Sequence, residues 1–296
     1  MSSRRENPKR QLNFTRPLYL LRARDFTIPL GEKTKIIGIV NITTDSFSDD
    51  GLLTKSGLSP QAHLRYGLKL IKEGADILDI GGESTRPGAQ PVSLREEIKR
   101  VIPVIRLLAQ KTNIPISVDT YKPEVAKLAL EAGASIINIV MGTKISKQML
   151  KVIKDYDAAV ILMHIRGTPR TMQKRIRYQC LITEIASELR KSVEKCLEAG
   201  IKSDRIVIDP GIGFCKTVEH NLEIIKRLSE LSALKKPILI GTSRKSFIGK
   251  ITNKNPLNRK WGTAATVCAS ILNGAHIIRV HDVAPMRDVA DVTDAI

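Results

Sequence analysis

Eight short apolar segments recur along this chain, and nearly every one ends in a residue able to do chemistry. They are rich in Ile and Val without polar alternation, which indicates strands buried on both faces. Amphipathic stretches of helical length separate them, so the sheet is expected to be parallel. The segments are KIIGIVN (35–41), ADILDIGG (75–82), PISVDT (115–120), SIINIV (135–140), AAVILMHI (158–165), RIVIDPG (205–211), PILIGTSRK (237–245) and HIIRVHDV (276–283).

The number of these segments predicts a single-domain α/β fold, a closed (β/α)8 barrel of the TIM type. The chain has 296 residues, and such a barrel commonly takes about 250. We expect the barrel to span residues 15–296, after a basic segment at residues 1–14 that is expected to be disordered. Residues 18–33, with the sequence LYLLRARDFTIPLGEK, are expected to pair as a hairpin that closes the barrel floor.

Features that the sequence lacks indicate where in the cell the protein is located. No apolar run approaches the roughly 18 residues that span a bilayer, so we expect no membrane segment and a soluble protein. The basic N-terminus lacks the apolar core of a signal peptide. The cysteines show no CxxC spacing, and we expect reduced thiols in a cytoplasmic protein. They are Cys180, Cys196, Cys215 and Cys268.

A formal charge of +18 raises the question of nucleic-acid binding. The basic residues are spread over the N-terminus and the segments 166–177 and 250–260, and they form no single stripe. Aromatic residues make up 4% of the chain, too few for the stacking platforms that bind single strands. We therefore expect no nucleic-acid partner, and a basic surface that attracts anionic substrates.

Carboxylates and amides end several of the apolar segments. Asp79, Asp119 and Asp209 lie within or at the ends of three segments, and Asn41 and Asn138 lie in two others. A buried carboxylate must find hydrogen-bond donors or become neutral. For Asp119 alone, the simpler explanation is that Asp119 or Thr120 caps the helix that Lys122 and Pro123 announce. The repetition on successive segments instead favours an active site at the carboxyl ends of the strands.

Two long loops follow the first two barrel strands. The first reads NITTDSFSDDG (41–51), which is typical either of an ordinary turn with a capped helix or of a ligand loop. The second reads GGESTRPGAQPVS (81–93) and carries Arg86. It is too long for a tight connection, and long loops in compact domains are often functional.

The last three strands end in residues of types that can bind anions. Glycines in DPGIGF are expected to form a loop that exposes Phe214, and GTSRKS (241–246) supplies cations and hydroxyls where barrels often bind phosphate. Arg279 and His281 alternate, so both point to one side of a strand and suit an oxyanion. The alternative for Arg279 is a structural ion pair with Asp282 or with a strand-end aspartate.

Seven motifs, taken in order, resemble the dihydropteroate synthase family of folate biosynthesis. The resemblance covers residues from about Ile36 to the C-terminus. Single motifs are weak signals, but seven of them with STRPG and SRKS are specific. They read NITTDSFSDDG, DILDIGGESTRPGA, ISVDTYKPEVA, MHIRGTPRTMQ, DPGIGF, GTSRKSFIG and GAHIIRVHDV.

The resemblance implies a transferase in which p-aminobenzoate displaces pyrophosphate from 6-hydroxymethyl-7,8-dihydropterin diphosphate and forms 7,8-dihydropteroate. It implies catalytic roles for Asp79, Asp119, Lys245, Arg279 and His281. It assigns the pterin to Asp119, Asn138, Asp209 and Lys245, and the diphosphate to Asn41, Arg86, Arg279 and His281. It assigns p-aminobenzoate to Phe47, Thr85, Pro87, Phe214 and Ser246.

The resemblance further implies a Mg²⁺ cofactor held through Asn41, a homodimer and a sulfonamide target. Magnesium prefers oxygen ligands and keeps several waters, so one amide oxygen plus the diphosphate is chemically reasonable. We expect the reaction to be dissociative, with diphosphate leaving before the amine attacks.

One position departs from the family pattern, and two other functions stay open. The family usually has Asp after the asparagine of the fourth strand, and this chain has Ile139. Strand alternation predicts that Ile139 faces away from Asn138, toward the helices.

A pterin-binding methyltransferase with a corrinoid partner is the nearer alternative function, although it has no use for STRPG or SRKS. A catalytically weak binding protein is the more distant one.

Overall fold

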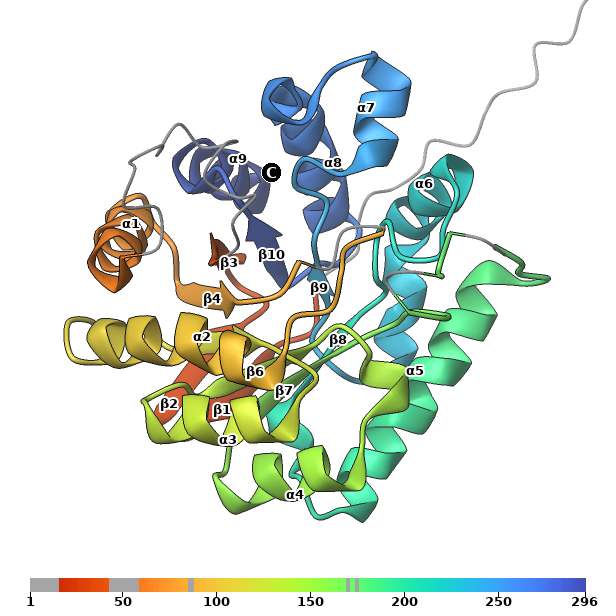
Figure 1. The fold of residues 1–296 in the computed structure, drawn as a ribbon. Coiled ribbons are helices and arrows are strands. Elements are labelled where there is room, and N and C mark those ends of the chain that lie inside the picture. The colour runs from red at the N-terminus through yellow and green to blue at the C-terminus, as the bar shows by residue number, and fades with distance from the viewer. Residues whose placement is uncertain (1–15, 43–58, 85–87, 169–170, 174–175) are drawn as a thin grey trace, which may run out of the picture.

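Eight parallel strands form a closed barrel with helices around it (Figure 1). The computed structural model describes residues 16–42, 59–84, 88–168, 171–173 and 176–296. The strands neighbour one another in the order β8-β7-β6-β5-β4-β3-β10-β9, and a parallel bridge between Ile208 and Ile238 joins the two outermost strands. The predicted (β/α)8 fold is confirmed. The segment at residues 1–14, predicted to be disordered, lies outside the described residues.

The barrel strands coincide with the eight apolar segments of the sequence. They are β3 (Lys35–Asn41), β4 (Ile77–Gly81), β5 (Ile116–Asp119), β6 (Ile136–Ile139), β7 (Ala159–Met163), β8 (Ile206–Asp209), β9 (Leu239–Ile240) and β10 (Ile277–Val280). The helices are α1 (Pro60–Lys72), α2 (Leu94–Ala109), α3 (Pro123–Glu131), α4 (Lys147–Asp155), α5 (Leu181–Glu198), α6 (Val218–Lys226), α7 (Ser246–Thr252), α8 (Lys260–Leu272) and α9 (Val283–Ala295). Short 3-10 turns are η1 (Gly142–Lys144), η2 (Ser203–Arg205), η3 (Leu228–Leu234) and η4 (Pro256–Asn258).

Local sequence explains where the helices begin. The hydroxyls of Ser93, Ser146 and Thr217 accept hydrogen bonds from backbone N–H groups in the first turns of α2, α4 and α6. Pro60 and Pro123 occupy the first turns of α1 and α3, where no N–H is needed. Among the described residues, no helix is long and apolar enough to cross a membrane.

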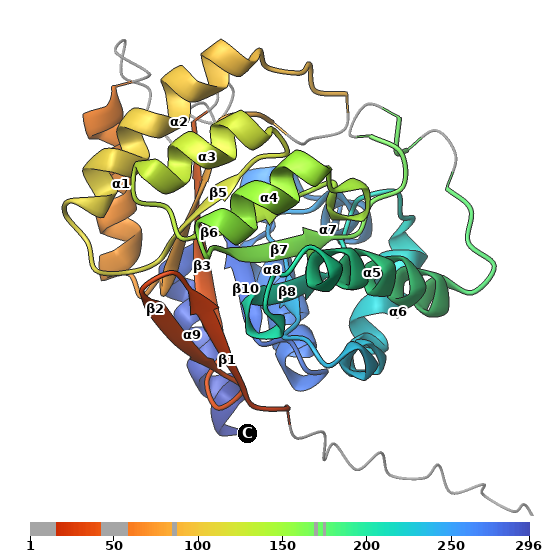
Figure 2. The same ribbon diagram turned by 90° about the horizontal axis from the view of Figure 1, so that it is seen from below.

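The predicted N-terminal hairpin is confirmed and closes the barrel floor. Strands β1 (Tyr19–Ala23) and β2 (Phe26–Leu30) pair antiparallel at the end of the barrel where the parallel strands begin (Figure 2). Leu21 and Leu30 are 1% and 2% exposed and belong to one core cluster with the first inward residues of the barrel strands, among them Ile37 and Ile136. The hairpin therefore excludes water from the floor and leaves the opposite end for the site.

Inside the barrel an apolar layer lies beneath a polar one. Successive inward residues of a strand are two positions apart. On β4, β6, β8 and β10, the residue two positions after an apolar floor residue is polar. The pairs are Ile77 and Asp79, Ile136 and Asn138, Val207 and Asp209, and Ile277 and Arg279. Alternate strands fill one layer of such a barrel, so these four strands bring their polar residues to one level.

The outer face of the strands packs on the helices. Ile139 is 2% exposed and belongs to the large core cluster that includes residues of α2, α3, α4 and α5. The expectation that it faces away from Asn138 is confirmed. The departure from the family pattern therefore lies between the sheet and the helices, on the face of β6 opposite Asn138.

Candidate active site

Four predicted residues meet in one hydrogen-bonded group inside the barrel. Asp79 Oδ2 accepts from Nε of Arg279 over 2.7 Å and from Nδ2 of Asn138 over 3.0 Å. Arg279 also donates through Nη2 to Oδ2 of Asp119 over 3.2 Å. The group joins β4, β5, β6 and β10, whose sequence positions are up to 200 residues apart. The cap predicted as the simple alternative for Asp119 does not form, because its carboxylate faces Arg279 across the barrel and Lys122 starts α3.

Burial and like charge raise the pKa of Asp119, while Arg279 lowers it. Burial disfavours the charged form of Arg279, but Asp79 and Asp119 outweigh burial and raise its pKa. Asp79 is fully buried, and its Oδ1 has no hydrogen-bond partner among the described residues. The group therefore holds two carboxylates against one guanidinium, with unused acceptor atoms for a ligand that carries N–H donors.

Asp209 ends β8 and is 6% exposed. Its Oδ1 accepts from the backbone N–H of Gly211 over 2.7 Å. Burial raises the pKa of Asp209 to about 6, although the Gly211 N–H and the cation of Lys245 oppose this. Gly211 has φ +71°, and a Cβ there would lie 2.0 Å from the carbonyl oxygen of His164. Only glycine fits this turn.

Lys245 and Phe214 form the next part of the site. Nζ of Lys245 lies 4.1 Å from the centroid of the Phe214 ring, a cation–π contact. Burial and the cation of Arg279 lower the pKa of Lys245 to about 8. The prediction that Phe214 is exposed is wrong, since it is 8% exposed and packs with Val140, Met163, Ile165, Met172 and Cys215. Ser246 follows Lys245 as the exposed first residue of α7.

Ser243 and His281 touch at the ends of β9 and β10. Oγ of Ser243 lies 3.0 Å from Nδ1 of His281 and accepts from its backbone N–H over 3.2 Å. Asp282 pairs with Arg244, with an Nη2–Oδ1 distance of 2.7 Å, and it does not pair with Arg279. Of the two structural pairs considered for Arg279, only the one with strand-end aspartates forms.

Asn41 ends β3 beside Gly81 of β4. A Cβ at Gly81 would lie 3.6 Å from Asn41 Oδ1, so the amide points across the end of the neighbouring strand. The described residues hold no cluster of three or more His, Cys, Asp or Glu that could bind a metal ion. An amide oxygen suits Mg²⁺, but a single neutral ligand needs further oxygens from a bound anion. Four other predicted residues, Phe47, Thr85, Arg86 and Pro87, lie outside the described residues.

The structure also shows polar groups to which the sequence analysis assigned no role. Lys122 Nζ donates to Oε2 of Glu83 over 2.6 Å and to a carboxylate oxygen of Glu97, so it ties the end of β4 to α2. Lys216 is buried against His164 behind the β8 loop. Lys122 lies within the motif ISVDTYKPEVA, and Lys216 lies two residues after DPGIGF. Nothing in the sequence around either lysine signals a buried partner.

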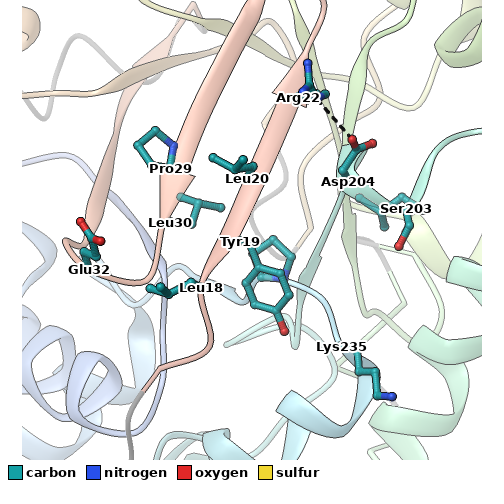
Figure 3. Close-up of a pocket in the computed structure, with 12 residues that line it drawn as sticks. Leu18, Tyr19, Leu20, Arg22, Pro29, Leu30, Glu32, Ser203, Asp204 and Lys235 are labelled. Atoms are coloured by element: carbon teal, nitrogen blue, oxygen red, sulfur yellow. Dashed lines mark ion pairs between the residues drawn. The ribbon is translucent and has the colours of Figure 1, made fainter.

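A separate pocket of about 680 Å³ lies at the floor end, between the hairpin and the start of β8 (Figure 3). Leu18 and Leu20 line it and are 67% and 55% exposed. Its ion pair joins Arg22 and Asp204 at 3.5 Å, with both side chains more than 40% exposed. An exposed ion pair of this kind contributes little to the stability of the fold. The hydrogen-bonded group of Asp79, Asn138 and Arg279 lies toward the opposite end of the barrel.

Comparison with known proteins places these residues in a family. A family model described as pterin binding enzyme matches residues 37–281. Dihydropteroate synthase of Synechocystis sp. is 45% identical over 267 residues, 90% of this chain and 91% of the relative. The crystal structure of Yersinia pestis dihydropteroate synthase with a sulfonamide drug complex has a TM-score of 0.87 at 37% identity, and covers 93% of this chain and 98% of that one.

A second solved structure is similar. Xanthomonas albilineans dihydropteroate synthase with 4-aminobenzoic acid has a TM-score of 0.85 at 39% identity, and covers 94% of this chain and 98% of that one. The residues of the barrel mouth from Asn41 to His281 fall within the match to the family model. This chain belongs to the pterin binding enzyme family.

Proposed function

We propose that this protein is a dihydropteroate synthase. The amino nitrogen of p-aminobenzoate forms a bond to the exocyclic methylene carbon of the pterin, the bond from that carbon to the diphosphate oxygen breaks, and the amine loses a proton. The observation that carries the proposal is the buried polar group inside the barrel, in which Arg279 is hydrogen-bonded to Asp79 and Asp119, and Asn138 to Asp79. The names of the similar proteins support it.

The pterin is proposed to bind between Asp119 and Asp209. An aminopyrimidinone edge offers several N–H donors, and buried carboxylates can accept them. The amide of Asn138 is oriented by Asp79, and Lys245 stands over Phe214 at the side of this space. Donors from the ligand would replace the guanidinium contact of Asp119 and would favour its charged form.

The diphosphate is proposed to bind at Arg279 and His281, with Arg86 and Asn41 completing the set. Arg279 can stabilise the charge that develops on the leaving oxygen. Oγ of Ser243 lies 3.0 Å from Nδ1 of His281 and orients its ring at the end of β10. Mg²⁺, held through Asn41 Oδ1 together with the diphosphate, would supply further charge neutralisation.

p-Aminobenzoate is proposed to bind near Phe214 and Ser246, with Phe47, Thr85 and Pro87 from the two long loops. The Xanthomonas albilineans structure, solved with 4-aminobenzoic acid, supports this substrate. The Yersinia pestis structure with a sulfonamide supports the proposal that sulfonamides compete at the same place. No base is needed for the attack if diphosphate leaves first, because a neutral aromatic amine is already nucleophilic. Positional isotope exchange in the diphosphate without p-aminobenzoate tests that order, and absence of exchange would favour a concerted reaction.

A homodimer and a cytoplasmic location complete the proposal. Large apolar side chains are exposed on neighbouring elements near the C-terminus, and a patch of this kind is typical of an interface. They are Ile251 at 55% on α7, Leu257 at 48% on η4 and Trp261 at 74% on α8. The four cysteines form no disulfide, which fits a reducing compartment.

The test is pyrophosphate release by purified protein given the pterin diphosphate, p-aminobenzoate and Mg²⁺. Release that requires both substrates supports the synthase. Pterin binding without release would favour the corrinoid-dependent methyltransferase or the weak binder, and methyl transfer from methyltetrahydrofolate to a corrinoid would then distinguish them.

A further inference from the structure

A buried lysine lies behind the site and has no place in the proposed reaction. Lys216 is 4% exposed, and its Nζ donates to the carbonyl oxygen of Phe214 over 2.9 Å. The same Nζ lies 3.1 Å from Nδ1 of His164, which is fully buried at the end of β7. Neither residue belongs to the proposed pterin, diphosphate or p-aminobenzoate sets.

The protonation state of Lys216 decides the donors in this pair. Burial lowers the pKa of Lys216 to about 7, although the charge of Asp209 opposes this. In its ammonium form the lysine has only donors, so Nδ1 of His164 then accepts and the ring proton is on Nε2. Burial and the neighbouring Lys216 lower the pKa of His164 to about 4, which agrees with a neutral ring. Nε2 lies 3.1 Å from Oε2 of Glu188 on α5, although the angle is poor for a hydrogen bond.

The contacts continue outward to the helix surface. Glu188 accepts from Nε of Arg166 over 2.8 Å, and Arg166 also donates to Glu184 over 2.7 Å. The guanidinium of Arg166 lies 4.2 Å from the centroid of the Tyr178 ring. These bonds join the start of the β7–α5 loop to α5, so the position of His164 does not depend on Lys216 alone.

Several hydrogen bonds hold the β8 loop. The backbone N–H of His164 donates to the carbonyl oxygen of Asp209 over 2.9 Å, and Oδ1 of Asn221 accepts from the backbone N–H of Gly213 over 2.7 Å. The carbonyl oxygen of Gly213 accepts from Nε2 of Gln173 over 2.9 Å. At Phe214, whose ring contacts Lys245, the backbone N–H donates to Gly211 within the loop, and the carbonyl oxygen accepts from the side chain of Lys216.

We propose that Lys216, whose Nζ contacts His164 and the Phe214 carbonyl, is a positioning residue that orients the Phe214 ring and thereby one wall of the p-aminobenzoate pocket. A buried amine is disfavoured unless its hydrogen-bonding groups are satisfied, and here its partners are a backbone carbonyl of the site and an imidazole fixed from outside. The inference rests on the proposed assignment of Phe214 to the p-aminobenzoate pocket.

Steady-state kinetics of the full chain with both substrates test it. In Lys216→Met the KM for p-aminobenzoate should rise about tenfold or more, while the KM for the pterin diphosphate changes less than about threefold. In a Phe214→Leu background, Lys216→Met should have little further effect, because both changes act through one contact. An unchanged KM for p-aminobenzoate in folded Lys216→Met, or additive effects in the double variant, would overturn the proposal.

Matched controls separate positioning from general damage. Lys236 is also a buried lysine, 6% exposed, but bonds to Ser203 at the floor. Lys236→Met should leave the KM for p-aminobenzoate unchanged, and an equal rise there would contradict the role of Lys216.

A second variant covers the case in which Lys216→Met does not fold. His164→Asn keeps an acceptor for Lys216 and should stay near the wild-type KM for p-aminobenzoate, whereas His164→Leu should raise it. Equal values for the two variants would refute the proposal. His276→Leu, at the floor, is the control for loss of a buried histidine. Inactivity of the wild-type protein would instead refute the synthase function itself.

Discussion

Arg279 donates from Nε to Oδ2 of Asp79 over 2.7 Å, and this bond spans two alternate strands of the barrel, β10 and β4. Asp79 is fully buried, and its hydrogen-bond donors are the guanidinium of Arg279 and the amide of Asn138. The guanidinium thus supports the buried carboxylates and also faces the space proposed for the diphosphate. Its removal should therefore affect both folding and catalysis.

Arg279→Ala is expected to lower pyrophosphate release by about a hundredfold or more, because a charge partner of the transition state is lost. Its free energy of unfolding should also fall by about 3–5 kcal/mol, since a buried pair loses one partner. Rate assays and urea unfolding measure these effects. Arg287→Ala is the control, as Arg287 pairs with Asp76 and Asp291 away from the site. Wild-type rates in folded Arg279→Ala would exclude the proposed role.

Asp209→Asn is expected to stabilise the fold while it weakens pterin binding. Burial raises the pKa of Asp209 to about 6, so the carboxylate destabilises the native state fully above that pH and not at all below its ordinary pKa of about 4. At pH 8 the gain should be about 1–3 kcal/mol, since the asparagine oxygen can still accept from Gly211. Thermal unfolding at pH 8 and pH 4.5 should show a clearly larger difference between variant and wild type at the higher pH.

The value of kcat/KM for the pterin diphosphate is expected to fall on both sides of neutrality. Below about pH 6 Asp209 gains a proton and can no longer accept freely from the pterin. Above about pH 8 Lys245 loses its charge. A pH profile measures both limbs. Lys245→Arg should move the alkaline limb upward, and an unmoved limb would assign it to another group.

Magnesium is expected to bind the protein only together with the pterin diphosphate. The described residues offer no cluster of ligands of their own, and Asn41 supplies one neutral oxygen. Calorimetric titration of Mg²⁺ should show no binding to the free protein and clear binding in its complex with the diphosphate. Asn41→Ala should weaken the second titration, and tight binding to the free protein would contradict this account.

Trp261→Glu is expected to shift the protein from dimer toward monomer, because it places a charge in the exposed apolar patch of α7, η4 and α8. Sedimentation velocity over a range of concentrations measures the change. Val292→Glu, on α9 at 64% exposure, is the control on another surface. A wild-type protein that sediments as a monomer would refute the dimer.

The sequence alone predicted the eight strands, the hairpin and the family. Strands such as Ile136–Ile139 and Ile206–Asp209 are apolar on both faces, and only a parallel sheet covered by helices buries both. Alternation with period two also predicted correctly that Ile139 faces the helices. These features are local, so the order of residues along one strand is sufficient to predict them.

The tertiary structure decided which side chains touch. Phe214 was predicted to be exposed and is buried, because Met163 and Met172 from the preceding strand and loop cover it. The sequence left open a pair of Arg279 with a strand-end aspartate, and only the structure decided that the partners are Asp79, 200 residues away, and Asp119. The contact of Lys216 with His164 was not predicted from sequence. The sequence by itself determined which residues lie at the strand ends. Only the closing of the barrel brings the polar residues of alternate strands to one level. Because they are buried there, the charged groups must form ion pairs and hydrogen bonds with one another.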